Sequence, residues 1–458
     1  MKKDQIKKIA FLIIGLCSLA AISCKKYLEA KPDQSLTVPG TIKDLWAILD
    51  NTSTMTLKYP SSSEVLSDNY FLRDDTWAAL SSTVLRSQYI WEKNDNTNID
   101  WLSYSVSYAS NIVLENLLKI DPSPSPAEWN SVKGSALFFR GLNLYTISQL
   151  FAPPFSQSTQ NSPYGIPLRL SSNFGEKSVR STVGETYARI LSDFKLSSAL
   201  LPSKGLTKTR PSRPAAYAMI SKTYLAMKQY DSAGYYANKC LMMYDSLLNF
   251  NKDIIPSAAA PFKRFNREVI FHARSGSSTI LAPARAIIDT TLYRSYQVND
   301  LRKTAYFKAN TGVNSGTYCF KGDYDGSGTS SGFVFAGVIT DELYLIRAEC
   351  YAKAGQTALA MADLNKLLST RFNTSFVPLS AVDPDQALTI ILTERRKELL
   401  FRGTRWTDLR RLKDENEHSV IPKRWLNGKM YELNPNSSGY VLQLPAAVIN
   451  LSDMEQNP

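Results

Sequence analysis

Two distant segments of the chain carry side chains in the same order, and this order limits how either segment can pack. In residues 217–241 and in residues 343–368, a helical stretch rich in large residues is followed by a Lys-Gln or Gly-Gln turn and then by a stretch rich in alanine. Small alanine side chains let two helices approach closely, so each segment is predicted to form an antiparallel helix pair. The alanines include Ala218, Ala226, Ala233 and Ala237 in the first segment and Ala348, Ala352, Ala354, Ala358 and Ala360 in the second.

This pattern resembles the tetratricopeptide repeat, in which helix pairs stack along the chain. An unrelated helix hairpin would need small residues at its interface for the same reason, so that alternative stays open. In either case one pair cannot bury its own apolar face and must stack on neighbouring elements. We therefore expect a mainly α fold in which tetratricopeptide-like helix pairs form a scaffold.

Helical periodicity and breaks at proline or glycine divide much of the remaining chain into further helices. Hydrophobic residues make up 44% of the chain and charged residues 21%, a balance that is typical of a globular protein. The expected helices span residues 41–49, 102–120, 129–151, 183–201, 214–230, 231–248, 340–353, 357–372, 384–402 and 404–413, with Thr41 as the cap of the first.

Three stretches lack a long helical pattern. Residues 51–98 are predicted to contain loops and short helices, and residues 414–458 are predicted to be irregular. Residues 251–335 are rich in proline, glycine, serine and threonine, with strand-like fragments such as residues 269–273. We interpret them as a loop-rich insertion that carries a few short strands, and long insertions in compact proteins are usually functional.

The first residues predict secretion and a lipid anchor. Four lysines precede an apolar stretch at residues 9–22, which is too short to span a bilayer comfortably. Small residues then lead into Cys24 in a pattern that resembles a bacterial lipobox. We expect residues 1–23 to be a lipoprotein signal peptide, Cys24 to be the lipid attachment site and residues 24–40 to form a lipid-anchored tether. The alternative is an ordinary signal peptide beside an incidental cysteine.

Charge and cysteine content argue against several classes of protein. The formal charge is +12, but no run of five or more basic residues occurs, so we expect no binding to nucleic acid. Beyond the leader, Cys240, Cys319 and Cys350 form no C-x-x-C motif, which leaves a disulfide framework and a zinc ribbon without support. Cys240 and Cys350 fall on apolar helical faces and are expected to be small core residues.

Metal and cofactor chemistry find little support in the sequence. His272 and His418 are the two histidines of the chain, and neither has neighbours at metal-ligand spacing. Residues 323–328 faintly resemble a calcium-binding loop, but no Glu closes it, and a glycine-rich turn is the simpler interpretation. No phosphate-binding loop or dinucleotide fingerprint occurs, so we expect no metal and no cofactor.

The segment from Glu394 to Arg411 mixes acidic and basic residues across a predicted helix, a glycine turn and a second helix. A buried charge without a partner is costly, so these side chains are expected to pair with one another and with backbone groups. Glu394 and Glu398 could instead form the carboxylate pair of a glycoside hydrolase, but their arginine neighbours would keep both ionised, whereas a general acid needs a raised pKa. The residues of this structural motif are Glu394, Arg395, Arg396, Glu398, Gly403, Arg405, Trp406 and Asp408.

With other parts of the chain, this motif resembles the SusD/RagB family. Residues 394–411 are similar to its signature, residues 24–29 to its mature start and residues 444–458 to its tail. Arg402 stands where the family often has an acidic residue, which puts one ion pair in doubt. The resemblance implies a SusD-like fold, with residues 41–458 as a single SusD-like helical domain.

The resemblance also implies a function. It indicates a non-catalytic lipoprotein of the cell outer membrane, exposed at the surface, that binds a glycan or oligosaccharide and passes it to a TonB-dependent SusC-like transporter. The RagB branch of the family implies a peptide cargo instead. Two other functions have less support. A secreted glycoside hydrolase needs a catalytic carboxylate pair, and the sequence offers no convincing one. A cytosolic tetratricopeptide scaffold requires that the leader is never cleaved.

Aromatic and polar side chains gather in the two loop-rich stretches, where a ligand would be expected to bind. Aromatic faces stack on sugar rings, and Asn, Asp and Arg side chains can bind hydroxyl groups. Each residue could equally pack in the core, and the family resemblance supplies no ligand motif for single residues. The candidate ligand-binding residues are Asn69, Tyr70, Arg73, Asp75, Trp77 and Trp91 in the early stretch and Tyr293, Tyr296, Tyr318 and Tyr324 in the insertion.

Overall fold

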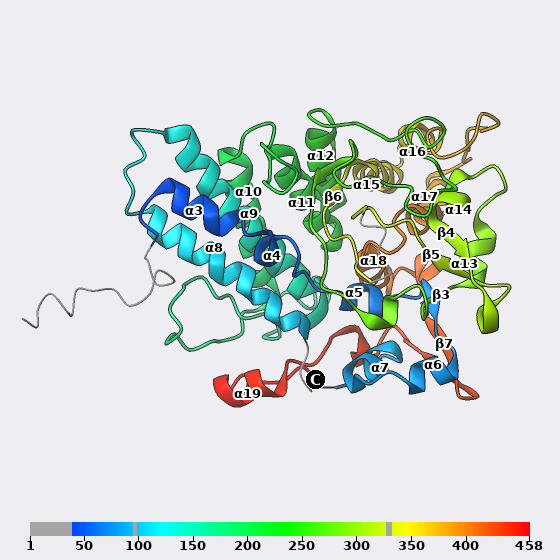
Figure 1. Cartoon of the computed structure of the whole chain (residues 1–458), viewed down its shortest axis with the longest axis horizontal. Helices are drawn as coiled ribbons and strands as arrows, with labels where there is room; N and C mark the ends of the chain where they lie inside the picture. Colours follow the sequence, from blue (N-terminus) through cyan, green and yellow to red (C-terminus); the bar gives the residue numbers. More distant parts are fainter. Residues whose placement is uncertain (1–38, 95–98, 327–331) are drawn as a thin grey trace, which may run out of the picture.

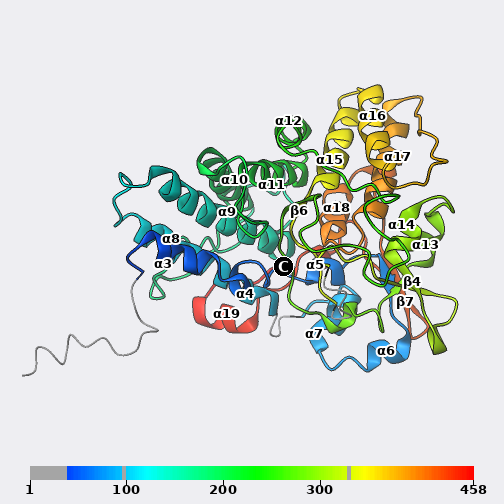
Figure 2. The same cartoon turned by 45° about the horizontal axis from the view of Figure 1, so that its top comes forward.

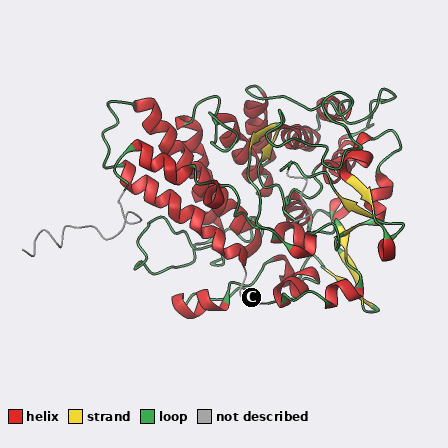
Figure 3. Cartoon of the chain, in the orientation of Figure 1, coloured by secondary structure: helices red, strands yellow, loops and turns green. Residues whose placement is uncertain are grey.

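Helices make up most of the regular structure of the protein, and its strands are short (Figure 3). The computed structural model describes residues 39–94, 99–326 and 332–458, so the predicted leader, the tether up to residue 38 and Cys24 lie outside the described residues. The helices are α3 (Ile42–Leu49), α4 (Thr52–Met55), α5 (Ser62–Val65), α6 (Asp74–Ala78), α7 (Thr83–Tyr89), α8 (Tyr104–Leu117), α9 (Pro126–Phe151), α10 (Val183–Leu200), α11 (Arg213–Ala226), α12 (Tyr230–Leu241), α13 (Thr290–Ser295), α14 (Leu301–Tyr306), α15 (Thr340–Lys353), α16 (Thr357–Leu368), α17 (Pro384–Glu398), α18 (Thr404–Leu412) and α19 (Ala446–Ser452).

The long helices stack side by side, largely in chain order, from α8 through α12 and on to α15, α16 and α17 (Figures 1 and 2). Helix α12 packs directly on α15, although the insertion separates the two in sequence. The stack is therefore continuous through the helices, and the insertion lies outside it. The mainly α fold predicted from the helix pairs is confirmed.

Helix α9 is the central member of the first half of the stack. Nearly every residue from Val132 to Phe151 is buried, because α8 and α10 both pack against this helix. A helix that is apolar on all sides is expected in a core. Gly141 permits the close contact with α10, since a Cβ atom there would lie 3.0 Å from the ring of Phe194.

The two segments with the alanine pattern form the predicted helix pairs, α11 with α12 and α15 with α16. Ala233 and Ala237 are fully buried in the first pair, and Ala348 and Ala360 are fully buried in the second. Cys240 and Cys350 are buried beside them, as predicted for small core residues.

The insertion is joined to the rest of the chain by short antiparallel strand pairs. Strand β1 pairs with β3, and β2 pairs with β6, so each of these pairs links the insertion to a flanking segment; β4 pairs with β5 inside it. The few short strands expected there are present. The strands are β1 (Tyr70–Phe71), β2 (Val269–Phe271), β3 (Ile287–Ile288), β4 (Phe307–Ala309), β5 (Tyr318–Phe320), β6 (Val338–Ile339), β7 (Lys423–Leu426) and β8 (Lys429–Glu432).

Two expectations about the C-terminal part of the chain were wrong. Residues 414–458 are not irregular throughout, because β7 and β8 form an antiparallel hairpin and α19 follows it. The helix predicted to end at residue 402 ends at Glu398, because Phe401 and Gly403 adopt positive φ angles of 57° and 66° that close the turn into α18. Within the described part of the chain, no helix is both long and apolar enough to cross a membrane.

Candidate functional site

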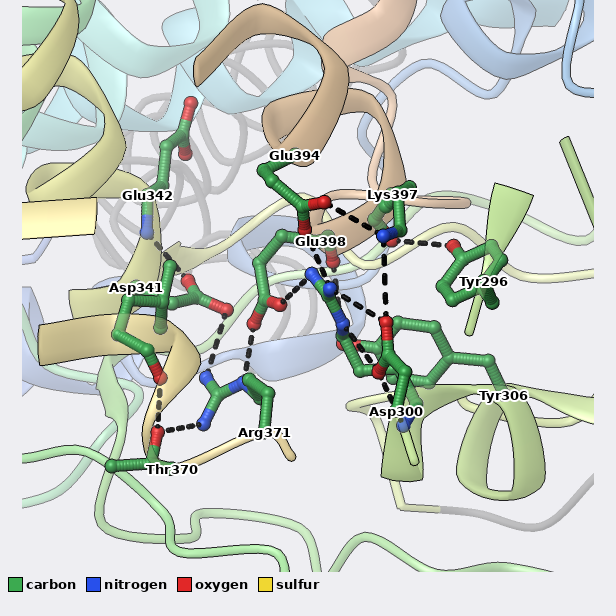
Figure 4. Close-up of polar contacts among 12 residues, drawn as sticks. Tyr296, Asp300, Tyr306, Asp341, Glu342, Thr370, Arg371, Glu394, Lys397 and Glu398 are labelled. Carbon is green, nitrogen blue, oxygen red and sulfur yellow. Dashed lines mark hydrogen bonds and ion pairs between the residues drawn. The ribbon is translucent and has the colours of Figure 1, made fainter. Parts of the chain in front are cut away.

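The charged segment of α17 and α18 forms a buried ion network, and most of its partners come from distant parts of the chain (Figure 4). Arg302 from the insertion lies at its centre and is fully buried. Its guanidinium nitrogens lie 2.8 Å from Asp300, 2.6 Å from Glu394 and 3.0 Å from Glu398. Lys397 completes the cluster with contacts to Glu394 and Asp300.

A second buried arginine, Arg371, continues the network toward the insertion. It lies 2.7 Å from Glu268 and 2.7 Å from Glu398, so Glu398 is shared between Arg371 and Arg302. Burial alone would raise the pKa of the Glu398 carboxyl, but the two arginines outweigh burial and lower that pKa to about 2. Glu398 is therefore a fixed anion that accepts hydrogen bonds, and it is unsuited to act as a general acid.

The remaining motif residues are paired as well. Arg395 lies 2.9 Å from Asp408 and 3.3 Å from Glu342, while the indole N–H of Trp406 donates to the carbonyl oxygen of Gln149 at 3.0 Å. Arg396 and Arg405 both contact Asp68. The pairing predicted for this segment is present, although sequence reasoning missed the partners Asp68, Arg302 and Arg371.

Arg402, whose ion pair the sequence left in doubt, is paired in the structure. Its Nη1 atom donates to Asp341 at 2.6 Å, and its guanidinium lies 4.0 Å from the centre of the Tyr324 ring. The arginine at this position therefore has a carboxylate partner on α15.

Residues 323–326, at the start of the loop that resembles a calcium-binding site, form a turn. The Asp323 side chain accepts a hydrogen bond from the backbone N–H of Asp325 at 2.8 Å, and Gly326 has a φ of 64°. Asp325 contacts Arg264 at 2.9 Å and His272 at 3.1 Å, so its oxygens face protein groups. Residues 327–328 lie outside the described part of the chain, within which no cluster of three or more His, Cys, Asp or Glu residues is arranged to hold a metal.

Half of the candidate ligand-binding residues pack in the core. Burial leaves their side chains no surface for a ligand in this structure, and each has an internal partner or packing role. The Asn69 amide donates to Glu64 at 2.8 Å, and the Tyr296 hydroxyl donates to the carbonyl oxygen of Lys397 at 2.7 Å. The buried residues are Asn69, Tyr70, Trp91, Tyr296 and Tyr324, all with exposed fractions of 7% or less.

The other candidates reach solvent, and four of them form two contacting pairs, Arg73 with Asp75 and Tyr293 with Tyr318. Nη1 of Arg73 donates to the backbone oxygen of Val313 in the insertion at 3.1 Å, and the same guanidinium pairs with Asp75. The rings of Tyr293 and Tyr318 stack with their centres 3.6 Å apart. Helix α6, which carries Trp77, lies on the same side of the molecule as α13 and the β4–β5 hairpin (Figures 1 and 2).

Sequence reasoning missed a tryptophan at this surface. Trp425 lies on the β7–β8 hairpin with 61% of its surface exposed, opposite Met430, which is 44% exposed. The turn of the hairpin contacts α6, because the backbone N–H of Asn427 donates to Asp74 at 3.0 Å. We call Arg73, Asp75, Trp77, Tyr293, Tyr318 and Trp425 the candidate ligand surface.

Partial burial of Tyr293, together with the nearby Tyr318 hydroxyl, raises its pKa to about 12. The Tyr293 hydroxyl is therefore neutral at physiological pH and can donate a hydrogen bond to a polar ligand.

A cavity of about 900 Å³ lies elsewhere, between α8, the loop at residues 167–178 and α19. Tyr108 and Phe174 lie at this groove with ring centres 4.7 Å apart. Several of its polar groups are already bound to protein: the Tyr104 hydroxyl donates to the backbone oxygen of Pro167, and the Asn111 amide donates to those of Arg169 and Ser171. This groove is a second place where a ligand could bind.

Comparison with known proteins gives the family. A SusD-like family model described as "Starch-binding associating with outer membrane" matches residues 26–225, and the model of the SusD family matches residues 340–458. The chain belongs to the SusD/RagB family. The resemblance drawn from the motif of α17 and α18 is thus confirmed, and the stretch between the two SusD/RagB matches includes the insertion.

Solved structures agree on the SusD-like fold. A SusD superfamily protein of Bacteroides thetaiotaomicron has a TM-score of 0.75 and 20% identity, over 91% of this chain and 100% of that chain. A SusD superfamily protein of Bacteroides vulgatus has a TM-score of 0.74 and 18% identity, over 91% and 99%. A SusD-like carbohydrate binding protein of the same species has a TM-score of 0.69 and 17% identity, over 90% and 97%. No curated protein matches the chain.

Proposed function

We propose that this SusD/RagB member binds a glycan or oligosaccharide at the candidate ligand surface, without cleaving it, and passes it to a TonB-dependent SusC-like transporter in the outer membrane. One observation carries the proposal: three separate segments of the chain, joined by the Arg73–Val313 and Asn427–Asp74 hydrogen bonds, carry exposed or half-exposed rings together with charged and hydroxyl groups. Rings provide rigid apolar faces for sugar rings, while charged and hydroxyl groups bind sugar hydroxyls. The family description as starch-binding and associated with the outer membrane supports the same cargo and location.

A non-catalytic role is supported by the electrostatics of the carboxylate pair that was considered for hydrolysis. Glu394 and Glu398 are buried with Arg302 between them, and the pKa of Glu398 is lowered to about 2. A glycoside hydrolase needs a carboxyl group that stays protonated beside its substrate; Glu398 is held ionised, and burial leaves neither carboxyl group open to a substrate.

Attachment to the membrane remains part of the proposal. Cleavage after residue 23 would leave Cys24 as the lipid-bearing residue, with the tether leading to the fold that begins near α3. Mass spectrometry of the protein from native membranes should find a diacylglyceryl group on Cys24, and an unmodified Cys24 would contradict this part.

The binding proposal is tested by calorimetry with a panel of oligosaccharides, followed by chromatography of the recovered sugars. Trp425→Ala and Tyr318→Ala should each weaken binding by about tenfold or more, because a ring that anchors a ligand contributes at least about 1.4 kcal/mol. Phe174→Ala is the matched control, since Phe174 is also exposed, at 80%, but lies at the separate groove. Loss of binding in Phe174→Ala alone would move the site to that groove, and shortened sugars after incubation would contradict the non-catalytic role.

The peptide cargo implied by the RagB branch is the second candidate. Arg73 and Asp75 offer one cation and one anion at the surface, and these could bind the termini of a short peptide. The same calorimetry with oligopeptides decides between the two cargoes.

A further inference from the structure

A small, partly open cavity lies where the two halves of the helix stack, the insertion and the charged motif meet. Its volume is about 60 Å³, and its lining comes from α9, α11, α15, α17 and the turn into α18, with Val334 and Ala336 from the insertion side. This cavity is distinct from the candidate ligand surface, and no residue is common to both. A water molecule needs roughly 10–15 Å³ of such volume, so the cavity can hold a small inorganic ion or a few water molecules.

Cationic groups outnumber anionic groups in the lining. Lys222, Arg395 and Arg402 line the cavity, whereas Glu342 is the one carboxylate among its lining residues. Both arginine side chains are almost completely buried, with exposed fractions of 3% and 7%. A charge held so far from water interacts strongly with whatever occupies the space beside it.

Each of these cations has a carboxylate partner, but every partner is shared with a second cation. Glu342 is divided between Lys222 at 2.8 Å and Arg395 at 3.3 Å. Asp341 contacts Arg402 at 2.6 Å and also lies 3.7 Å from Arg371. Arg395 also has a second partner, Asp408, at 2.9 Å, so the protein supplies a carboxylate to each of the three cations, although Glu342 is the one that lines the cavity.

Two guanidinium nitrogens in this lining have no acceptor among the described residues. Nη1 of Arg395 and Nη2 of Arg402 are buried and make no hydrogen bond, although Nε and Nη2 of Arg395 and Nη1 of Arg402 each donate to a carboxylate. A buried N–H without an acceptor is unfavourable by roughly 1–3 kcal/mol, and more when the group is charged. An occupant that accepts hydrogen bonds from both arginines would remove this penalty.

We propose that the cavity is a binding site for a small inorganic anion of the halide class, held between Arg395 and Arg402. An anion supplies the acceptor that the two nitrogens need, in a lining that holds three cations and one carboxylate. The turn that carries Arg402 and Gly403 then closes over the ion and links α17 and α18 to α9 and α11. The site depends on Arg402, because this residue supplies one of the two buried nitrogens without an acceptor.

Crystals of the purified protein grown in sodium bromide test the site directly. An anomalous difference peak within hydrogen-bonding distance of both Arg395 and Arg402 is expected. Density without anomalous signal would mean that water alone fills the cavity and would overturn the proposal.

Thermal unfolding tests the same site in solution. At equal ionic strength, sodium bromide or chloride should raise the Tm of the wild-type protein by roughly 2 °C over sodium gluconate, whose anion is too large for the cavity. Arg402→Gln should remove this difference, and Arg267→Gln, which alters a half-exposed ion pair with Asp253, should keep it. If Arg402→Gln does not fold, the wild-type comparison still decides. An equal Tm in both salts, even with a bromide peak, would indicate binding at crystal concentration only and would overturn the proposal.

Discussion

The pKa values of the buried carboxyl groups of Glu64 and Glu398 differ sharply, because different residues surround the two groups. Glu64 is fully buried, and its donors are the neutral groups of Asn69, Ser67 and the backbone of Gly403. Burial raises the pKa of Glu64 to about 6, because neutral donors only partly offset the loss of water. Glu398 lies between two arginines, and its pKa is lowered to about 2.

The raised pKa of Glu64 predicts a pH dependence of stability. In the unfolded chain the carboxyl group ionises near its ordinary value of 4.5, whereas the native protein keeps the proton up to about pH 6. The native state therefore binds more protons in this window, so its free energy of unfolding falls as pH rises, by about 2 kcal/mol from this group. Glu64→Gln should reduce the fall measured by urea unfolding between pH 4.5 and pH 7.

Asp341 also has a raised pKa, of about 7, so part of the pH dependence should remain in Glu64→Gln. Glu176→Gln alters an exposed carboxylate and should keep the wild-type dependence. Identical slopes for Glu64→Gln and wild type would show that Glu64 is not the group that titrates.

Residue roles were the hardest part to predict from sequence. Asn69 was predicted to contact a ligand, yet it donates to Glu64 inside the core. Residue type alone could not separate these roles, because burial of Asn69 depends on α17 and α18, which lie far along the chain. Trp425 shows the opposite error, since a ring in a segment expected to be irregular is one of the most exposed aromatic groups.

Elements with a strong local pattern were predicted well. Thr41 caps α3 as expected, and the alanine-rich helix pairs begin within one residue of their predicted starts, although α12 ends at Leu241 and not at the predicted residue 248. The β7–β8 hairpin was missed, although Asn427-Gly428 is a strong hairpin signal between two runs of strand-forming residues. Positive φ angles of 50° and 72° at these two residues fit such a turn.

The close contact between helices α12 and α15 predicts that a larger side chain at their interface lowers stability. A Cβ atom at Gly234 on α12 would lie 3.0 Å from the Cβ atom of Cys350 on α15. Gly234→Leu should therefore lower the free energy of unfolding by about 1–3 kcal/mol through overpacking, as measured by urea unfolding. Ala358→Leu on the exposed face of α16 is the matched control and should change stability by no more than about 0.5 kcal/mol. Equal losses in the two variants would contradict a close contact between α12 and α15.

In the whole molecule, buried charge joins the insertion to the helix stack. Arg302 comes from the insertion, and two of its three carboxylate partners, Glu394 and Glu398, lie on α17. The position of the insertion is therefore set by ion pairs as well as by the β1–β3 and β2–β6 pairings. The sequence held no local signal for the partners of Arg302, because those contacts span about ninety residues of chain.

Removing the central arginine should therefore destabilise the molecule strongly. Arg302→Met leaves Asp300, Glu394 and Glu398 without their shared cation, and the free energy of unfolding should fall by about 3–5 kcal/mol. Lys177→Met removes an ion pair whose lysine is 65% exposed and should lower it by less than about 1 kcal/mol. Urea unfolding of both variants measures the difference, and similar small losses would mean that the buried pairs add little to the position of the insertion.

The exposure of Trp425 has an optical consequence. Of the seven tryptophans, Trp425 is 61% exposed, while Trp46, Trp91 and Trp406 are buried and the other three are half-buried. Its fluorescence should have the longest emission wavelength and should be quenched first by dissolved iodide. A molecule that covers the hairpin would shift that emission toward the blue and shield it from the quencher, so an intrinsic signal reports occupancy of this one surface without any label.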